Sequence, residues 1–529
     1  MAIAPSRPAQ IDTFFSPPGA REDRWRTLVD AAKAWSSGNG SKAAFEEALN
    51  EVAVIEEFHG YPGPALMASL RNRVNGDDAM GTAALTWRIF SSLLTRSFRQ
   101  HAADWDPYGD TTEAVPDVLP PGLGNGKKKH PYFETLIVTG APVERWQAIA
   151  TEWRRLRRPQ DDFVYETVIV GSAEDALCAA MLNPDIAAVV VHEGFQFHSR
   201  HDAPILRSIV DPLAEKESTG ASALRLARAL KRVRPELDLY LLSSQDVEKI
   251  AGDPSADSIR RIFYAVEELL ELHLAILEGI QARYETPFFD NLKRYAQRPI
   301  GTFHALPIAR GKSVFKSDWI RDMGDFYGPT LFLAESSATT GGLDSLLEPT
   351  GNIKKTQDLA ARAFGADRVF FVTNGTSTSN KMVVQALLAP GDIAIVDRNC
   401  HKSHHYGMVM SGVQPLYVEA FPLTQYSMYG AVPLRTIKRA LLAARAEGRL
   451  DRVKLIDLTN CTFDGHMYNT RRVMEECLAI KPDLIFLWDE AWSGFARWSP
   501  FLRPRTGMGA AAEIEAWLRD PASADACAR

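Results

Sequence analysis

The segment 373–380, of sequence TNGTSTSN, has the composition of a phosphate-binding loop. Its hydroxyl groups directly precede a helical pattern at 381–388, and the free backbone N–H groups and the dipole of a helix start attract an anion. The segment has neither a Gly-Lys-Ser/Thr ending nor a Gly-x-Gly-x-x-Gly motif, so a nucleoside triphosphate or a dinucleotide is not its natural ligand. It favours a small phosphorylated cofactor, although a turn that caps the helix also explains the segment when it is taken alone.

Three further polar features each follow a predicted strand of the same region. They are His401 after strand 393–396, the turn 459–465 after strand 453–458, and Asp489 after strand 484–488. Ligands bind at the carboxyl ends of the strands in open parallel sheets, so we expect these features to share one edge. Taken singly, they are a loop histidine, an Asx-type turn, and a carboxylate that pairs with a nearby Arg or Lys.

Taken together, these features predict a pocket for pyridoxal 5'-phosphate. Three residues of the hydroxyl-rich loop would hold the phosphate: Thr376, Ser377 and Thr378. His401 would cover one face of the pyridine ring, and Ala491 would leave room beneath the other face. Asp489 would keep the ring nitrogen protonated, because the ring must accept the electron pair released at the substrate Cα. His401 and Asp489 are the two catalytic residues that this pocket predicts.

The motifs TNGTSTSNK, DRNCHKS, TNCTFDG and DEAW resemble, in their order and wording, the bacterial-type ornithine/lysine/arginine decarboxylases. The resemblance extends from about Phe133 to Trp498. It implies an α/β protein with an aminotransferase-like large domain of fold type I, pyridoxal phosphate as cofactor, and Trp492 as a wall of the site. It also implies decarboxylation of ornithine, lysine or arginine to a diamine or agmatine by a homo-oligomer, a dimer or larger.

The chain departs from that family where the Schiff-base lysine is expected. The family carries this lysine in a Ser-x-His-Lys segment after the Asp-x-Ala-Trp motif, but no lysine follows Asp489 in this sequence. We therefore expect an incomplete large domain, a catalytic lysine supplied from beyond this chain or by a partner chain, and no activity from this chain alone. The run 303–312 lacks the family's Pro-Gly-His-Lys-Gly-Gly wording, so the choice among the three basic amino acids stays open.

The expected organisation combines periodicity with the resemblance. We expect a helical N-terminal extension at 1–114, a linker at 115–132, a flavodoxin/receiver-like wing domain at 133–250, a helical linker region at 251–298, and the cofactor-binding large domain at 299–529. Strands are predicted in the wing at 135–139, 165–170, 187–191 and 237–242, and in the large domain at 369–372, 393–396, 414–418, 453–458 and 484–488. Apolar positions from Ile259 to Ile280 predict one amphipathic helix between the two domains.

Composition narrows the class of protein. A net charge of −6 indicates neither nucleic acid nor an anionic membrane as a partner, and no apolar run is long enough to span a membrane. The N-terminus does not have the pattern of a secretion signal. The cysteines are scattered without a Cys-x-x-Cys pair, which indicates reduced thiols and a cytoplasmic location. They are Cys178, Cys400, Cys461, Cys477 and Cys527.

Two groups that contain histidines are candidate metal sites. The first has no carboxylate or thiolate at the spacing that would complete a zinc site, and the second fits no zincin spacing, so no metal is predicted. The groups are His401, His404 and His405 in the large domain, and His192, Glu193, His198 and His201 in the wing.

Two other functions remain open. A different fold type I reaction, such as transamination, is disfavoured by the wing-like domain and the DRNCHKS wording. A non-catalytic subunit that assembles with a full-length homologue and regulates it is the alternative from a different class.

Overall fold

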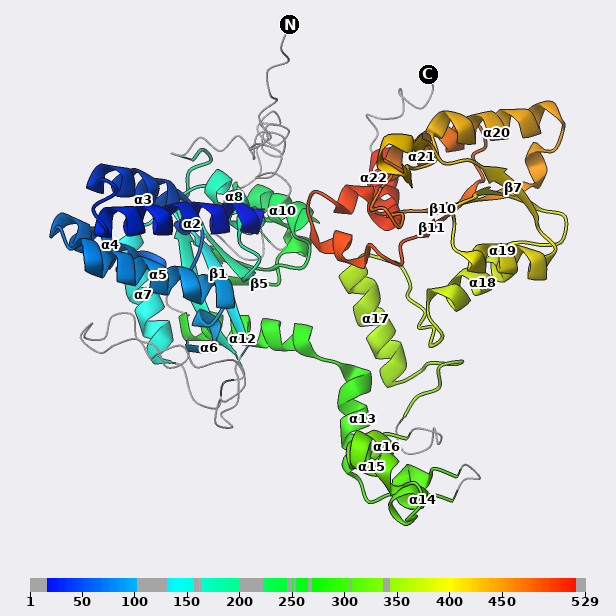
Figure 1. The fold of residues 1–529 in the computed structure, drawn as a ribbon, viewed down its shortest axis with the longest axis horizontal. Helices are drawn as coiled ribbons and strands as arrows, with labels where there is room; N and C mark the ends of the chain where they lie inside the picture. The colour runs from blue at the N-terminus through cyan, green and yellow to red at the C-terminus, as the bar shows by residue number, and fades with distance from the viewer. Residues whose placement is uncertain are drawn as a thin grey trace, which may run out of the picture. The chain divides into compact units, whose positions relative to one another are not determined.

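The computed structural model describes residues 17–101, 131–156, 161, 163–199, 222–244, 250, 254–264, 269–303, 307–335 and 343–519. The chain divides after Tyr284 into two compact units. The first unit contains the N-terminal helices and a parallel sheet with its own helices, and the second contains the helices from α13 onward and a second parallel sheet (Figure 1). No helix among the described residues is long and apolar enough to cross a membrane.

The first unit begins with helices that enclose their own apolar core, as predicted for the N-terminal extension. They are α2 (Pro17–Ser36), α3 (Lys42–Glu56), α4 (Gly63–Asn75), α5 (Ala79–Thr95) and α6 (Phe98–His101). Ser41 and Asp78 cap α3 and α5 through side-chain oxygens that accept a backbone N–H in the first turn. The core between the helices includes Trp25, Phe45 and Leu70, all at most 1% exposed.

A five-stranded parallel sheet follows, in the order β2-β1-β3-β4-β5. This is the strand order of flavodoxin-like domains, and it confirms the predicted wing. Its strands are β1 (Tyr132–Val138), β2 (Val164–Val170), β3 (Ile186–His192), β4 (Asp238–Ser243) and β5 (Arg261–Tyr264). Its helices are α7 (Val143–Arg155), α8 (Ala173–Leu182), α10 (Ser222–Val233) and α12 (Leu269–Tyr284), with a 3-10 turn, η1 (Pro254–Ser258). α7 and α12 pack together against one face of the sheet (Figure 1).

The amphipathic helix predicted from Ile259 is wrong in its first part. Residues 261–264 form β5, which pairs with β4, and the helix α12 starts only at Leu269. The backbone groups on the open edge of β4 need partners, and Phe263 reaches the core of the wing, where it is 1% exposed. A short apolar run fits a helix or a strand, so its periodicity alone could not decide.

The second unit contains helices around a four-stranded parallel sheet of order β11-β10-β6-β7. Its strands are β6 (Ile393–Asp397), β7 (Gln414–Val418), β10 (Val453–Thr459) and β11 (Ile485–Asp489), with a small hairpin of β8 (Pro422–Leu423) and β9 (Met428–Tyr429). Its α-helices are α13 (Pro287–Gln297), α14 (Lys312–Phe315), α15 (Arg321–Tyr327), α16 (Pro329–Leu333), α17 (Asn352–Phe364), α18 (Thr376–Leu387), α19 (Lys402–Ser411), α20 (Leu434–Ala446), α21 (Thr470–Leu478) and α22 (Gly507–Arg519). Its 3-10 turns are η3 (Ala309–Gly311), η4 (Thr424–Tyr426), η5 (Leu450–Arg452), η6 (Gly494–Trp498) and η7 (Arg503–Arg505). Parallel sheets in both units confirm the predicted α/β class.

The strand predicted at 369–372 is wrong. The structure assigns no strand there, and Phe370 is 74% exposed. The apolar run Val-Phe-Phe-Val has strand-forming residues, but a strand is stable only when a neighbouring strand takes its backbone groups, and no described strand pairs with it.

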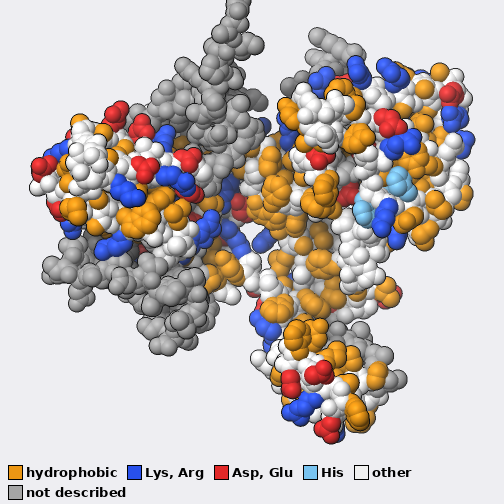
Figure 2. Space-filling model, in the orientation of Figure 1, with side chains coloured by type: hydrophobic (Ala, Val, Ile, Leu, Met, Phe, Trp, Pro, Cys, Tyr) orange, Lys and Arg blue, Asp and Glu red, His pale blue; other side chains and the backbone are white. Residues whose placement is uncertain are grey.

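Large apolar side chains are exposed in the second unit. Several lie in the segment that contains α14, α15 and α16, where Trp319, Phe326 and Leu331 are each more than half exposed (Figure 2). An apolar patch of this kind is typical of a surface that another chain or segment covers.

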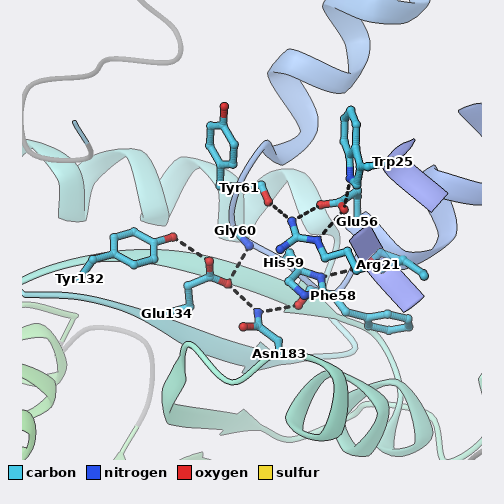
Figure 3. A network of polar contacts seen from close by, with 11 residues as sticks. Arg21, Trp25, Glu56, Phe58, His59, Gly60, Tyr61, Tyr132, Glu134 and Asn183 are labelled. Atoms are coloured by element: carbon cyan, nitrogen blue, oxygen red, sulfur yellow. Dashed lines mark hydrogen bonds and ion pairs between the residues drawn. The ribbon is translucent and has the colours of Figure 1, made fainter. Parts of the chain in front are cut away.

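A buried polar network joins the helices of the first unit to its sheet (Figure 3). Glu134 of β1 is 2% exposed and accepts three hydrogen bonds, from Tyr132 Oη, Gly60 N and Asn183 Nδ2, each at 2.7 Å. Burial raises the pKa of the Glu134 carboxyl from 4.5 to about 7, although the three donors oppose that shift. Arg21 and Trp25 bind Glu56 on the helical side of the same junction.

The raised pKa of Glu134 predicts a pH-dependent stability. Between pH 4.5 and 7 the folded carboxyl holds a proton that the unfolded chain releases, so the free energy of unfolding falls as pH rises. One pKa unit corresponds to about 1.4 kcal/mol, so the loss reaches up to about 3 kcal/mol. Denaturant unfolding at pH 5 and pH 8 should show this loss in the wild type but not in Glu134→Gln, whose amide can keep the three partners.

Glu134→Ala provides the comparison for this experiment. It leaves the three donors without an acceptor and should destabilise the first unit by about 2–4 kcal/mol at both pH values. An equal pH dependence in the wild type and Glu134→Gln would contradict the assignment of this slope to Glu134.

Candidate functional site

Three polar features predicted to share an edge of the sheet do so. β11, β10 and β6 are neighbouring parallel strands, so their carboxyl ends meet at one edge of the second sheet. Asp489 is the last residue of β11, Asn460 directly follows β10, and His401 follows β6 by a few residues. The chemistry predicted for them therefore falls within one small region.

The loop predicted to bind phosphate leads into α18. Gly375 precedes the helix with φ of 76° and ψ of 177°, a backbone conformation almost confined to glycine, and the helix starts at Thr376. Thr376 is exposed, and Ser377 and Thr378 are half-buried. Within the described residues, the hydroxyl groups of Thr376 and Ser377 make no hydrogen bond. This first turn can therefore present hydroxyls and backbone N–H groups to an anion.

Asp489 lies at the end of β11 and is 6% exposed. Its Oδ2 receives hydrogen bonds from Asn380 Nδ2 at 3.1 Å and from His404 Nε2 at 2.9 Å, and its Oδ1 accepts the N–H of Ala491 at 3.1 Å. Burial opposes ionisation of this carboxyl, but the donors, led by His404, hold its pKa below the usual range. The side chain is therefore an ionised carboxylate whose orientation is fixed from two helices.

His401 joins the same network from the start of α19. Asn380 Nδ2 donates to Ser403 Oγ at 3.1 Å, and Ser403 Oγ lies 2.9 Å from His401 Nδ1. Because Ser403 also donates its backbone N–H to that nitrogen, Nδ1 of His401 acts as an acceptor. The ring itself is exposed, so one face of it is free to lie against a ligand. α18 and α19 lie side by side, which brings these residues together (Figure 1).

The remaining predicted site residues lie around Asp489, and Ala491 contacts it through its backbone N–H. Ala491 is exposed, and Trp492 is 66% exposed, with its ring centroid 5.3 Å from that of Phe463 in the loop after β10. Asn460 is fully buried and donates to Glu490 Oε1 and to the carbonyl of Arg505, both at 2.7 Å. The side-chain amide of Asn460 therefore holds the neighbouring loops in place and is not available to a ligand.

Sequence reasoning missed the partnership of His404, Asp457 and Asn380. The sequence pattern indicates His404 only as a candidate metal ligand, yet it lies between Asp489 and Asp457, with its Nδ1 2.7 Å from Asp457 Oδ2. The signal was present in strand 453–458, where an aspartate interrupts the apolar sequence and must find a cation if it is buried.

No cluster of His, Cys, Asp and Glu that could hold a metal ion occurs among the described residues. In the wing, His192 Nδ1 lies 3.0 Å from Thr139 Oγ1, and His198 Nδ1 lies 3.1 Å from Glu174 Oε1. Glu193 accepts from Ser243 Oγ, and His201 lies outside the described residues.

Comparison with models of known protein families finds a match for part of this chain. Residues 286–518 match the family described as "Orn/Lys/Arg decarboxylase, major domain". This match confirms the resemblance predicted from the motifs, together with pyridoxal phosphate as the cofactor that the family implies. It also supports the aminotransferase-like fold expected for the large domain.

Two curated relatives and one solved structure illustrate the similarity. The lysine decarboxylase LdcA of Pseudomonas aeruginosa is 29% identical over 324 residues, which cover 59% of this chain and 43% of that protein. The constitutive ornithine decarboxylase of Escherichia coli is 32% identical over 287 residues, covering 52% and 38%. The solved structure of lysine decarboxylase A from Pseudomonas aeruginosa has a TM-score of 0.40 at 28% identity and covers 72% of this chain and 49% of that one. The chain spans less than half the length of these two curated relatives.

The backbone conformation of Gly375 should be needed for phosphate binding at the start of α18. Gly375→Ala would strain the backbone by about 1–3 kcal/mol and shift the first turn of α18. We expect pyridoxal phosphate to bind at least about tenfold more weakly, with little change for pyridoxal, which has no phosphate. Absorbance titration of the two ligands measures the difference.

Gly448→Ala is the matched control for this variant. Gly448 also has a positive φ, 68°, and open space around it, but it lies between α20 and β10, at the opposite edge of the sheet. Equal losses of affinity in the two variants, or equal losses for the two ligands, would contradict a phosphate site at α18.

Proposed function

We propose, from the premise that residues 286–518 belong to the Orn/Lys/Arg decarboxylase family, that this chain is part of a pyridoxal-phosphate enzyme that decarboxylates a basic amino acid. The observation that carries the proposal is the ionised carboxylate of Asp489, which Asn380 connects to the first turn of α18. A cation site and an anion site adjoin each other at one edge of the sheet. That pairing fits a ligand with a protonated ring nitrogen and a phosphate.

The residues present fit this cofactor. Three residues at the start of α18 would bind the phosphate: Thr376, Ser377 and Thr378. His401 would lie against one face of the ring, and Ala491, without a larger side chain, would leave room at the other. Trp492 would wall the site together with Phe463. When bound, pyridoxal phosphate supplies a ring that accepts the electron pair left at the substrate Cα as carbon dioxide departs.

Asp489 would hold a proton at the ring nitrogen. Its carboxylate is ionised at neutral pH because His404, Ala491 and Asn380 donate to it, so it can pair with a cation without first losing a proton. A ring nitrogen that keeps its proton withdraws electrons more strongly, which is the role of the carboxylate in decarboxylation. The exposed ring of Trp492 would cover the site and reduce access of water to it.

We propose lysine, ornithine or arginine as the substrate and a diamine or agmatine as the product. The names of the matched relatives include lysine, arginine and ornithine decarboxylases, which supports the class and leaves the choice within it open. A cytoplasmic location is part of the proposal, since the cysteines of the described residues are unpaired.

The catalytic lysine is proposed to come from outside residues 1–529. No lysine follows Asp489 in the sequence, and Lys402, next to His401, is exposed at the start of α19. We propose a homo-oligomer, or an assembly with a chain that supplies the lysine, and the exposed apolar residues of the second unit support such a contact. This chain alone would bind the cofactor without turning over substrate.

The function can be tested with the native protein isolated from its source and loaded with pyridoxal phosphate. We expect carbon dioxide and the matching amine from one of lysine, ornithine or arginine, and no product from residues 1–529 alone. Asp489→Asn should lower kcat at least about a hundredfold, because the ring nitrogen loses its counter-ion. Asp483→Asn is the control, since Asp483 is an exposed aspartate that pairs with Lys481 away from the site.

Two outcomes would contradict this assignment. A keto acid formed without carbon dioxide would identify a transaminase. Full activity of Asp489→Asn would show that the carboxylate does not serve the cofactor.

A further inference from the structure

Asp457 is a carboxylate in the middle of a buried strand. Its neighbours in register are Leu487 of β11 and Val396 of β6, so neither adjacent strand offers it a charge or a donor. Asp457 is fully buried, and His404 is its only cationic partner within ion-pair distance among the described residues. Such a charge is costly to bury unless it is paired, so the position of Asp457 depends on His404.

His404 is itself fully buried between two carboxylates. Its Nδ1 lies 2.7 Å from Asp457 Oδ2 and its Nε2 lies 2.9 Å from Asp489 Oδ2. A neutral imidazole carries one N–H, so only the doubly protonated ring can pair with both carboxylates, and the two ion-pair distances favour that form. Nε2 also lies 2.9 Å from Asn380 Nδ2. Burial opposes this charge, but Asp457 and Asp489 outweigh it and raise the pKa of His404 to about 9.

The charges of this trio do not cancel. Burial raises the pKa of the Asp457 carboxyl, although His404 opposes that rise. With both carboxylates ionised, the trio carries one negative charge in excess beside the first turns of α18 and α19. Oδ2 of Asp489 is occupied by His404 and Asn380, whereas the one donor to Oδ1 among the described residues is the N–H of Ala491. The excess charge is therefore directed away from His404, on the side of Asp489 that Ala491 borders.

We infer that His404 and Asp457 are positioning residues for the cofactor: they keep Asp489 ionised and hold it in the orientation that pairs with the ring nitrogen. This inference rests on the proposed function and deepens it. Neither residue touches the cofactor, and each acts through Asp489. Residues that orient a ligating group typically change the affinity of a site about 10–100-fold when they are replaced.

Loss of the imidazolium proton would disturb Asp489 selectively. The remaining N–H would stay with Asp457, which has no other ion-pair partner among the described residues, so the bare Nε2 would face the Asp489 carboxylate. Asp489 would then move or take up a proton, and its pairing with the ring nitrogen would weaken. Three other titratable groups also face His404 or its carboxylates: Asp397, Cys400 and His405. The pH profiles are therefore compared between variants, in which these groups are the same.

The test is a titration of the chain with pyridoxal phosphate, followed by absorbance between pH 7 and pH 10. In the wild type we expect the affinity to be constant up to about pH 9 and to fall above it. Asp457→Asn should shift the midpoint of this fall by at least about one pH unit to lower pH, and should lower the affinity at pH 8 about tenfold. A merely structural role of Asp457 would not move the midpoint.

Two further variants complete the test. The double variant with His404→Leu and Asp457→Leu replaces the buried pair with apolar side chains, so it should fold, bind about tenfold more weakly at pH 7 and lose the fall above pH 9. His405→Asn is the matched control, one position along the same helix, where the ring contacts Tyr417 Oη at 3.1 Å instead of Asp489. Because it removes only a more distant charge, it should move the midpoint much less than Asp457→Asn does.

The outcomes separate the inference from the function on which it rests. Asp457→Asn and the double variant could show the same pH profiles as the wild type while Asp489→Asn binds pyridoxal phosphate weakly. That result would overturn the inference and leave the proposed function standing. A wild-type chain that does not bind pyridoxal phosphate would overturn both.

Discussion

The carboxylate of Asp489 is the interaction on which the candidate site depends. It lies at the end of an apolar strand, where an unpaired charge would be strongly unfavourable. His404 and Asn380 stabilise it from two different helices, and the N–H of Ala491 stabilises it from its own loop. Removing one partner of a buried ion pair typically costs about 3–5 kcal/mol, so this carboxylate constrains the packing of α18, α19 and β11 together.

The parallel sheet explains why these groups meet. Its strand order places the carboxyl ends of β11, β10 and β6 next to each other, although the residues that follow them are far apart in the sequence. Each crossover helix begins at that edge, so the starts of α18 and α19 add their positive dipole ends to the same region. An anion site and a carboxylate can therefore adjoin without repelling each other.

The first unit also contains a buried carboxylate that needs polar partners, on a different sheet. Glu134 is buried where the helical extension meets β1, and it is accommodated by three donors instead of a cation. Its pKa is raised, whereas that of Asp489 is lowered. The difference follows from the partners: an imidazolium stabilises the ionised form strongly, and neutral donors do so less.

Much of this arrangement could be predicted from the sequence. The strands that precede His401 and end at Asp489 are apolar runs with polar residues after them, and the α/β class followed from this pattern. The family followed from the wording of the motifs. Local pattern failed at Phe263 and at Phe370, because a short apolar run becomes a strand only if a neighbouring strand is there to pair with it. It also failed at His404, since the spacing of histidines on one helix says nothing about the aspartate of a strand that packs against it.

The proposed function depends on the pairing of Asp489 with a protonated ring nitrogen. The most direct measurement is the ¹⁵N NMR spectrum of pyridoxal phosphate, labelled at its ring nitrogen and bound to the protein at pH 8. We expect the chemical shift of a protonated pyridinium for the wild type and that of a neutral pyridine for Asp489→Asn. A neutral pyridine shift in the wild type would contradict it.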